Sequence, residues 1–469
     1  MSVHVDHQIS HEPPGPAGQP FLGSIAELRR NPMDFFTRIS QEYGGLCRFF
    51  YGRNPTFLAS TPEVIKELLV DRRKVYIKNK RYKALRELIG DGMLLSEGET
   101  WRTQRRATAP GFSNSLITDA LGRMVEIIDE RLDGWAADVE RGEPVEIEPR
   151  FSAISQALIA EWTLGGGYPD LVERLITAQL RLSELWPKPP RTVLGAYVPP
   201  SRRRMRGLKE CLAELNACFY EAIRRERAQP SDGEGILPLL ARFGTERSET
   251  QGKGRPETPF TDQELRDQLI TLYMAGFETS AATASWLFYR LSLQPEARAA
   301  VYAEAHAVFR DNTRNDDERT MEQRLEDLDL TRRSVQETLR IYPAAYNFSR
   351  VALEDTTLAG YAIPEGAMVI VSPWATHRLP SIYENPEGFD PDRFLPENAA
   401  DRSAFAFIPF GAGHRACIGT RLAMAQMPLV IARTCLRYRL DLAPSPRVEP
   451  APGSVLRPND GMKMVIQTL

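Results

Sequence analysis

A single cysteine in a glycine-rich turn that opens directly into a helix constrains this chain most. Residues 407–419 read F-I-P-F-G-A-G-H-R-A-C-I-G, and the residues after Cys417 are helix formers with few breakers. We expect the first backbone N–H groups of that helix to point back at the sulfur, which together with Arg415 favours the thiolate form. Gly419 lets a flat ligand approach the main chain closely. A thiolate presented in this way suits a metal; the alternative is a buried, inert cysteine beneath the turn.

The composition of the chain is that of an ordinary globular protein. Of its 469 residues, 42% are hydrophobic and 26% are charged, which excludes a disordered or fibrous chain. The net charge of −3 gives no overall attraction to nucleic acid or to an anionic membrane, and we expect no nucleic-acid partner. The five cysteines include no C-x-x-C pair and the six histidines are scattered, so we expect reduced, intracellular thiols and no zinc cluster.

From the start of the chain we expect no export signal. The first twenty residues contain no apolar stretch of signal-peptide length, and no uninterrupted apolar run is long enough to span a bilayer. We therefore expect a cytoplasmic protein with no transmembrane segment. Residues 1–20 are expected to form a flexible tail with a proline-rich hinge at residues 13–16.

Hydrophobic patterns and chain breakers predict a mainly helical protein with a few short strands. Helices are expected at residues 61–70, 99–109, 115–139, 151–164, 168–186, 202–227, 261–293 and 334–340. Strands are expected at residues 47–51, 56–59, 349–351 and 367–372, the first two as a hairpin, and a short hairpin is expected within 448–469. The intervening stretches are expected to be an irregular functional loop at 71–98, a flexible connection at 229–259 and a charged connector at 311–329.

The longest predicted helix has a gap in its middle. Residues 261–264 form a capping box, and Pro295 stops the helix after roughly nine turns. Gly276 stands inside it, where a glycine costs about 1 kcal/mol relative to alanine. Either the gap serves a ligand, or Gly276 allows tight helix packing while the Thr279 hydroxyl bonds its own backbone.

Two other pairs have helical spacing. Trp101 and Arg105 are four residues apart on one helical face, where they could be a surface cation–π pair. Glu337 and Arg340 are three residues apart and could be an ordinary surface ion pair. Neither pair identifies a function by itself.

The turn at Cys417 resembles the signature of the cytochrome P-450 haem-thiolate monooxygenases, in which a Phe, a Gly, a basic residue, the ligand Cys and a second Gly recur. Those five places are filled by Phe410, Gly413, Arg415, Cys417 and Gly419. The resemblance implies that Cys417 is the axial ligand of a haem b iron and that Arg415 pairs with a haem propionate. It also implies the mainly helical cytochrome P-450 fold with a small β-rich lobe, and a single haem domain over residues 21–469.

Further stretches are similar to the family in order and spacing. The residues implied to contact haem propionates are Trp101, Arg105 and Arg350. Glu337 and Arg340 would be buried and joined by Arg393, which would lock the structure around the haem loop. His377-Arg378 also matches the family, and we assign it a structural role.

The gap in the long helix also has a counterpart in the family. By the resemblance, Ala275 and Gly276 make room for dioxygen, while Glu278 and Thr279 deliver protons to it. The helix after Cys417 departs from the family pattern: Gln426 stands where an acid is common, and Pro428 predicts a kink.

The resemblance implies a monooxygenase that inserts one oxygen atom from dioxygen into an apolar small molecule by hydroxylation or epoxidation. Terpenoids, fatty acids and polyketides are equally compatible substrates. Because the sequence ends about fifty residues after Cys417, we expect no fused flavin domain. Electrons from NAD(P)H would then arrive through separate redox proteins, a ferredoxin or flavodoxin type with its reductase. The residues expected to steer that partner are Arg102, Arg106, His414 and Arg421.

Two alternatives of other classes stay open, and we expect a monomer in each case. A haem-thiolate peroxygenase or hydroperoxide isomerase needs no electron donor and usually lacks the acid–threonine pair. A non-catalytic haem-binding protein or sensor would need the thiolate but no proton delivery. Glu278 and Thr279 argue for the monooxygenase.

Overall fold

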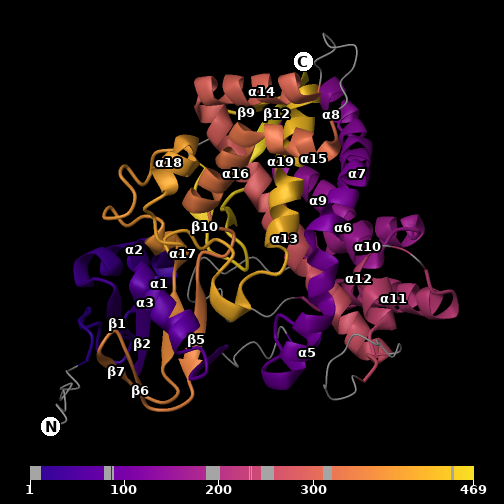
Figure 1. The fold of residues 1–469 in the computed structure, drawn as a ribbon. Helices are drawn as coiled ribbons and strands as arrows, with labels where there is room; N and C mark the ends of the chain where they lie inside the picture. The colour runs from indigo at the N-terminus through magenta and orange to yellow at the C-terminus, as the bar shows by residue number, and fades with distance from the viewer. Residues whose placement is uncertain are drawn as a thin grey trace. The chain divides into compact units, whose positions relative to one another are not determined.

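The computed structural model describes residues 12–78, 86, 89–185, 201–231, 233, 235–244, 258–309, 319–444 and 448–469. The structure is mainly helical with small sheets, as the sequence predicted (Figure 1). It divides into two compact units, which are described separately. Unit 1 comprises Met1–Arg81, Arg333–Cys417 and Glu449–Asn459, and unit 2 comprises Tyr82–Arg332, Ile418–Val448 and Asp460–Leu469.

A five-stranded sheet forms the centre of unit 1. Its strands, in spatial order, are β1 (Leu46–Tyr51), β2 (Asn54–Ala59), β8 (Met368–Val371), β5 (Phe348–Ala352) and β3 (Tyr76–Lys78). β2 and β8 run parallel, and every other neighbouring pair is antiparallel. The predicted hairpin at residues 47–59 is confirmed, as are the two later strands. β3 lies in the stretch that was predicted to be an irregular loop.

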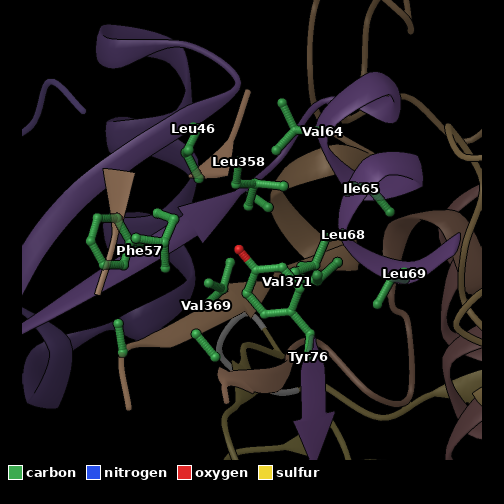
Figure 2. Packing of buried hydrophobic residues seen from close by; sticks show 14 of the residues in the cluster. Leu46, Phe57, Val64, Ile65, Leu68, Leu69, Tyr76, Leu358, Val369 and Val371 are labelled. Atoms are coloured by element: carbon green, nitrogen blue, oxygen red, sulfur yellow. The ribbon is translucent and has the colours of Figure 1, made fainter. Parts of the chain in front are cut away.

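Alternating side chains cover the two faces of this sheet. Phe57 of β2 packs on one face with Val369 and Val371 of β8, where helical residues including Leu68 complete the cluster (Figure 2). Leu58, the next residue of β2, points to the opposite face and packs in a second cluster that includes residues of α2. The period of two explains why consecutive apolar residues of one strand are all buried.

The remaining elements of unit 1 surround the sheet. The helices are α1 (Ile25–Arg30), α2 (Pro32–Tyr43), α3 (Pro62–Lys66), α17 (Pro373–Thr376), α18 (Pro396–Ala399) and most of α16 (Asp329–Ile341). A π-helical turn, Glu67–Asp71, continues α3, and short 3₁₀ turns lie at Pro391–Phe394 and Gly413–Arg415. Two hairpins complete the unit: β6 (Thr356–Leu358) with β7 (Tyr361–Ile363), and β10 (Pro450–Ala451) with β11 (Arg457–Pro458). The second of these is the hairpin predicted near the end of the chain.

Part of the predicted N-terminal tail lies against this sheet. The carbonyl of Pro14 accepts a hydrogen bond of 2.8 Å from the Arg48 N–H of β1. Gly15 is so close to the same strand that a β-carbon there would fall 1.7 Å from the Arg48 oxygen. Residues 1–11 lie outside the described residues, and the tail boundaries stay a prediction.

Unit 2 is built from helices. They are α5 (Gly98–Thr108), α6 (Asn114–Asp119), α7 (Leu121–Asp133), α8 (Ala136–Arg141), α9 (Ile147–Leu164), α10 (Pro169–Leu185), α11 (Arg202–Ala228), α12 (Ile236–Arg242), α13 (Asp262–Leu293), α14 (Pro295–Phe309), α15 (Met321–Asp327) and α19 (Thr420–Arg437), with a 3₁₀ turn at Ala109–Phe112. α13 packs along α9 and also contacts α11 and α19 (Figure 1). A three-stranded antiparallel sheet joins β4 (Val145–Glu146), β12 (Lys463–Thr468) and β9 (Tyr438–Leu442).

Several predicted boundaries in unit 2 were wrong. The single helix expected at residues 115–139 is three helices, α6 to α8. The apolar patch in the predicted connection at 229–259 is the helix α12, and the charged connector contains α15, which begins with its own capping box at Thr320. Parts of both connectors lie outside the described residues. α19 continues from Thr420 to Arg437 with Pro428 inside it.

The capping box predicted for the long helix is present in α13. The Thr261 hydroxyl accepts from the Glu264 N–H at 3.2 Å, and the Glu264 carboxylate accepts from the Thr261 N–H at 2.8 Å. Within the part of the chain that the structure describes, no helix is both long and apolar enough to cross a membrane.

Candidate functional site

Cys417 differs from the other four cysteines by its exposure. Cys47, Cys211, Cys218 and Cys435 are 0 to 3% exposed, whereas the Cys417 side chain is exposed. Burial raises the pKa of each of the four buried thiols, to about 11 for Cys218. Those four thiols are therefore poor ligands and nucleophiles. Cys417 is the cysteine that a ligand can reach.

Backbone hydrogen bonds fix the loop before Cys417, which lies in unit 1. The Cys417 N–H donates to the Phe410 oxygen at 2.8 Å, and the Gly411 N–H donates to the Ile408 oxygen at 3.0 Å. Gly411 and Gly413 have φ angles of 69° and 71°, a region that side-chain-bearing residues rarely adopt. The loop therefore turns back on itself and presents Cys417 after a short 3₁₀ turn.

A close approach to the main chain of Leu69 also requires glycine at residue 413. A β-carbon on Gly413 would lie 2.4 Å from the main-chain oxygen of Leu69, in the π-helical turn Glu67–Asp71. The thiol loop therefore rests directly on the backbone of this turn. π-Helical turns are rare and are often found at functional sites.

The Glu337–Arg340 pair is buried, as the resemblance implied. Both side chains are 0% exposed, and Arg340 Nε donates to Glu337 Oε2 at 2.7 Å. Arg393, 13% exposed, brings its Nε to 3.4 Å from Glu337 Oε1. The predicted three-residue ionic cluster is present, with Glu337 and Arg340 buried and Arg393 partly buried, and the alternative of a surface pair is wrong.

Arg350 and Arg415 occupy different parts of unit 1. Arg350 lies in β5, is 7% exposed, and donates from Nη1 to the Ser349 oxygen at 3.0 Å. Its guanidinium also lies 5.3 Å from the centre of the Phe348 ring. Arg415 is partly buried at the end of the 3₁₀ turn before Cys417. The assignment of both arginines to propionates stays a prediction.

In unit 2, the middle of α13 is unusual because it is partly exposed. Residues 267–273 and 281–289 of this helix are all buried. Between them Ala275 is exposed, and Glu278 and Thr279 are partly exposed. The middle of α13 is therefore less covered by protein than the buried stretches on either side of it.

Gly276 lies where α13 packs against α9. A β-carbon at Gly276 would collide with Ile159 of α9, so the missing side chain serves helix packing. The Thr279 hydroxyl donates to the Ala275 oxygen at 3.0 Å, as expected if it bonds its own backbone. The small residue on the exposed side is therefore Ala275. A role of Gly276 beside a cofactor stays a prediction.

The predicted pair on α5 is only partly exposed. Trp101 and Arg105 are both partly buried and lie one turn apart on the helix. Arg102 and Arg106, which were predicted to meet a redox partner, are exposed on the same helix, and Arg102 forms an ion pair with Glu99. Propionate contact by Trp101 and Arg105 stays a prediction.

Sequence reasoning missed the way that the loop before α5 is held on α13. Asp267 Oδ2 accepts from the Asp91 N–H at 2.9 Å, and Gln268 Oε1 accepts from the Met93 N–H at 3.2 Å. Both acceptors are buried, with exposures of 6% and 0%. Two adjacent polar residues in a buried stretch of helix are the signal that could have revealed this attachment.

Comparisons with known proteins place these features in a family. The family model described as "Cytochrome P450" matches residues 13–466. The chain is 29% identical over 445 residues to a cyclooctat-9-en-7-ol 5-monooxygenase of Streptomyces melanosporofaciens, covering 94% of this chain and 90% of that protein. It is 27% identical over 447 residues to a pentalenene oxygenase of Streptomyces avermitilis, covering 93% and 92%. The crystal structure of the cytochrome P450DA heme domain matches with a TM-score of 0.80 at 23% identity, covering 97% of each chain.

Proposed function

The chain belongs to the cytochrome P450 family, and on that premise we propose that it is a haem-thiolate monooxygenase that oxidises a terpenoid-like substrate with Cys417 as the axial ligand. Membership of the family makes it an oxidoreductase of the monooxygenase class that uses haem. The proposal adds the residues, the substrate class and the source of electrons. The observation that carries the proposal is the exposed side chain of Cys417. It follows a loop in which Gly411 and Gly413 have positive φ angles that other residues rarely adopt.

The residues present fit a haem group. One thiol of five is exposed, and the loop that carries it is shaped by positive-φ glycines and by contact with the Leu69 carbonyl. The exposed stretch of α13 offers the small side chain of Ala275 beside the hydroxyl of Thr279. An accessible thiolate is what a haem iron requires as its axial ligand.

Cys417 would hold the iron, and the family pattern assigns Arg415, Trp101, Arg105 and Arg350 to the propionates. When bound, the haem supplies the iron at which dioxygen is activated, and the thiolate raises the electron density there. The protein contributes position: the Cys417 N–H bonded to Phe410 keeps the sulfur at the end of a closed turn. Phe410, Gly413 and Gly419 would complete the contact around the thiolate.

Thr279 and Glu278 would deliver protons to the site. The Thr279 hydroxyl already donates to the Ala275 oxygen at 3.0 Å, and its lone pairs remain able to accept a hydrogen bond from a water molecule. Glu278 is partly exposed and can exchange protons with solvent. We infer that Glu278 supplies the proton and Thr279 holds the water that passes it on, while Ala275 leaves the space.

The relatives support a terpenoid-like substrate class. The names of these relatives describe oxidation of cyclooctat-9-en-7-ol and of pentalenene, which supports hydroxylation of a terpenoid-like substrate over the fatty acid and polyketide classes. We further propose that electrons come from NAD(P)H through a ferredoxin or flavodoxin and its reductase. The exposed Arg102, Arg106 and His414 would meet that partner together with Arg421. A monomer and a cytoplasmic location stay predictions.

Absorption spectroscopy of the reduced, carbon monoxide-bound protein tests the proposal. A thiolate ligand shifts the Soret band to the long wavelength characteristic of this family, and Cys417→Ala should abolish that shift. The matched controls are alanine substitutions at the four buried cysteines, which should each retain it. A shifted band in Cys417→Ala, or its loss in the controls alone, would show that the ligand is another residue.

A further inference from the structure

Arg340 is held more completely than an ion pair requires. Its Nε and Nη2 donate to the two oxygens of Glu337 at 2.7 and 2.8 Å. Its Nη1 donates to the carbonyls of His377 at 3.0 Å and Pro386 at 2.7 Å, and Nη2 also donates to the carbonyl of Gly388 at 3.0 Å. The five N–H groups of a guanidinium therefore all have acceptors. Arg340 is a fixed point in the core of unit 1.

His377 connects this fixed point to the loop that carries Cys417. The His377 side chain is 0% exposed, and its Nδ1 lies 3.1 Å from the carbonyl oxygen of Arg340. On the other side of the ring, Nε2 accepts from the Ile408 N–H at 2.9 Å. Since the amide must donate to Nε2, the ring proton is on Nδ1 and the imidazole is neutral. The ring also contacts Phe407, with 5.4 Å between ring centres.

Tyr383 makes a second connection to the same segment. Its ring lies 5.1 Å from the Arg340 guanidinium and its side chain is 1% exposed. Its hydroxyl donates to the Ala406 oxygen at 3.1 Å. The main chain on either side of Phe407 is thus bonded to two side chains that both contact Arg340.

Backbone hydrogen bonds continue from this segment to Cys417. The Ile408 oxygen accepts from the Gly411 N–H at 3.0 Å, and the Phe410 oxygen accepts from the Cys417 N–H at 2.8 Å. A displacement at Ile408 would therefore move the turn that ends at Cys417.

From these contacts we propose that His377 is a positioning residue for the Cys417 thiolate, with Tyr383 as its partner: together they fix the start of the thiol loop to Arg340. This rests on the proposed function, because it concerns the sulfur as an iron ligand. The inference goes beyond the buried ionic cluster, because it identifies His377 and Tyr383 as the side chains that link Arg340 of that cluster to the thiol loop.

A neighbouring residue provides a matched control. Thr376 precedes His377, is 0% exposed, and donates from its hydroxyl to the Ser60 carbonyl at 2.8 Å. This hydrogen bond is made to Ser60, directly after β2, and not to the thiol loop. Thr376→Val removes one buried side-chain-to-backbone bond with little change in shape, so it reproduces the loss of stability without the effect on the loop.

The experiment compares the rate at which the reduced, carbon monoxide-bound holoprotein converts from the red-shifted Soret band to the shorter-wavelength band of a haem without thiolate. His377→Phe keeps a ring against Phe407 but leaves the Ile408 N–H unpaired, and should speed the conversion about tenfold or more. His377→Gln, whose amide oxygen can accept from Ile408, should recover part of the wild-type rate. Thr376→Val should change the rate by less than about twofold even where it lowers the melting temperature to the same extent.

Tyr383→Phe keeps the test decisive if His377→Phe does not fold, because it removes only the hydroxyl bonded to Ala406. It should speed the conversion by a smaller factor in the same direction. Equal conversion rates in Tyr383→Phe, His377→Gln and Thr376→Val would overturn the inference and leave His377 a purely structural residue. A wild-type holoprotein with no red-shifted band would instead refute the proposed function, and with it this inference.

Discussion

Gly276 of α13 lies against Ile159 of α9, so that a β-carbon at residue 276 would fall 2.6 Å from Ile159 Cγ1 and 2.8 Å from Cδ1. A glycine inside a helix costs about 1 kcal/mol relative to alanine. The close contact with α9 accounts for that cost, because a β-carbon at this position would have to displace the Ile159 side chain. Gly276 therefore allows the two helices to pack closely, whereas its neighbour Ala275 lies in the exposed stretch of α13.

Gly276→Ala should consequently destabilise the fold by about 1 kcal/mol, since overpacking of about 1–3 kcal/mol outweighs the gain in helix propensity. The matched control is Gly122→Ala in α7, where a β-carbon would meet nothing within 4 Å. That change should stabilise the protein by up to about 1 kcal/mol. Urea unfolding of both variants checks the prediction. If Gly276→Ala were as stabilising as Gly122→Ala, packing would not explain the glycine.

The buried ion pair should be far more sensitive than an exposed pair on the same helix. Arg340→Met leaves the Glu337 carboxylate buried without its partner and should cost about 3–5 kcal/mol, seen as little haem-loaded protein. Arg332 pairs with Asp329 on the surface of α16, and Arg332→Met should cost at most about 1 kcal/mol. Comparable yields and unfolding midpoints for the two variants would show that the pair adds nothing to the fold.

Elements whose signals are local could be predicted from the sequence. The capping box at Thr261 and the stop at Pro295 gave both ends of α13, because helix ends are determined by residues within one turn. The hairpin β1–β2 was predicted for the same reason, from two β-prone runs around Gly52 to Pro55. The structure of such elements is determined by residues that are close in the sequence.

Elements that depend on distant partners could not be predicted. β3 is three residues long and exists by pairing with β5, where Tyr76 lies opposite Ala352. α12 is a seven-residue helix whose buried Ile236 and Leu240 pack in unit 2. Segments this short are marginal alone and acquire their structure from tertiary contacts.

Site residues could be predicted from the sequence only where the chemistry requires a particular side chain. Cys417, Thr279 and the Glu337–Arg340 pair could be singled out because a thiolate, a hydroxyl and an ion pair need specific residues. The burial of the ion pair is confirmed, and the roles of Cys417 and Thr279 stay predictions. The attachment of the thiol loop could not be found, because the partners of His377 are the main-chain atoms of Arg340 and Ile408. Every residue type has those atoms, and so the sequence does not reveal which of them a side chain will meet.

His377 should make the stability of the fold depend on pH. Burial is the main cause that lowers its pKa to about 3, and the charges of Arg340 and Arg378 act in the same direction. Because an ordinary histidine has a pKa near 6.5, the unfolded chain takes up the proton first as the pH falls. The stabilising effect of the neutral ring is present above pH ~6.5 and is lost progressively as the pH falls from there toward ~3.

In His377→Phe this titration is absent, so the unfolding free energy should fall less steeply between about pH 6 and pH 4.5, by up to about 1.4 kcal/mol per pH unit. Urea unfolding at several pH values measures the slope. Thr376→Val is the control, since it removes a buried side-chain hydrogen bond but no titratable group, and it should leave the slope close to that of the wild type. Identical slopes for the wild type and His377→Phe would mean that His377 does not titrate differently in the folded protein.

The last prediction concerns Thr279, whose hydroxyl lies in the exposed stretch of α13 and bonds the Ala275 oxygen. If it holds the water that passes a proton from Glu278, Thr279→Ala should leave haem content and substrate binding intact but divert electrons to hydrogen peroxide. Product formed per NAD(P)H consumed should fall roughly tenfold or more, since a positioned acid or base contributes about 10²–10⁴-fold. The measurement requires product and peroxide to be quantified in the same reaction.

Thr283 supplies the control for that experiment, one turn further along the helix. Its hydroxyl makes the same kind of bond, to the Thr279 oxygen at 2.8 Å, but the residue is 3% exposed and lies outside the exposed stretch. Thr283→Ala should therefore keep the coupling of the wild type. Unchanged coupling in both Thr279→Ala and Glu278→Gln would remove this pair from the mechanism and favour a peroxygenase, which needs no delivered protons, because peroxide brings its own.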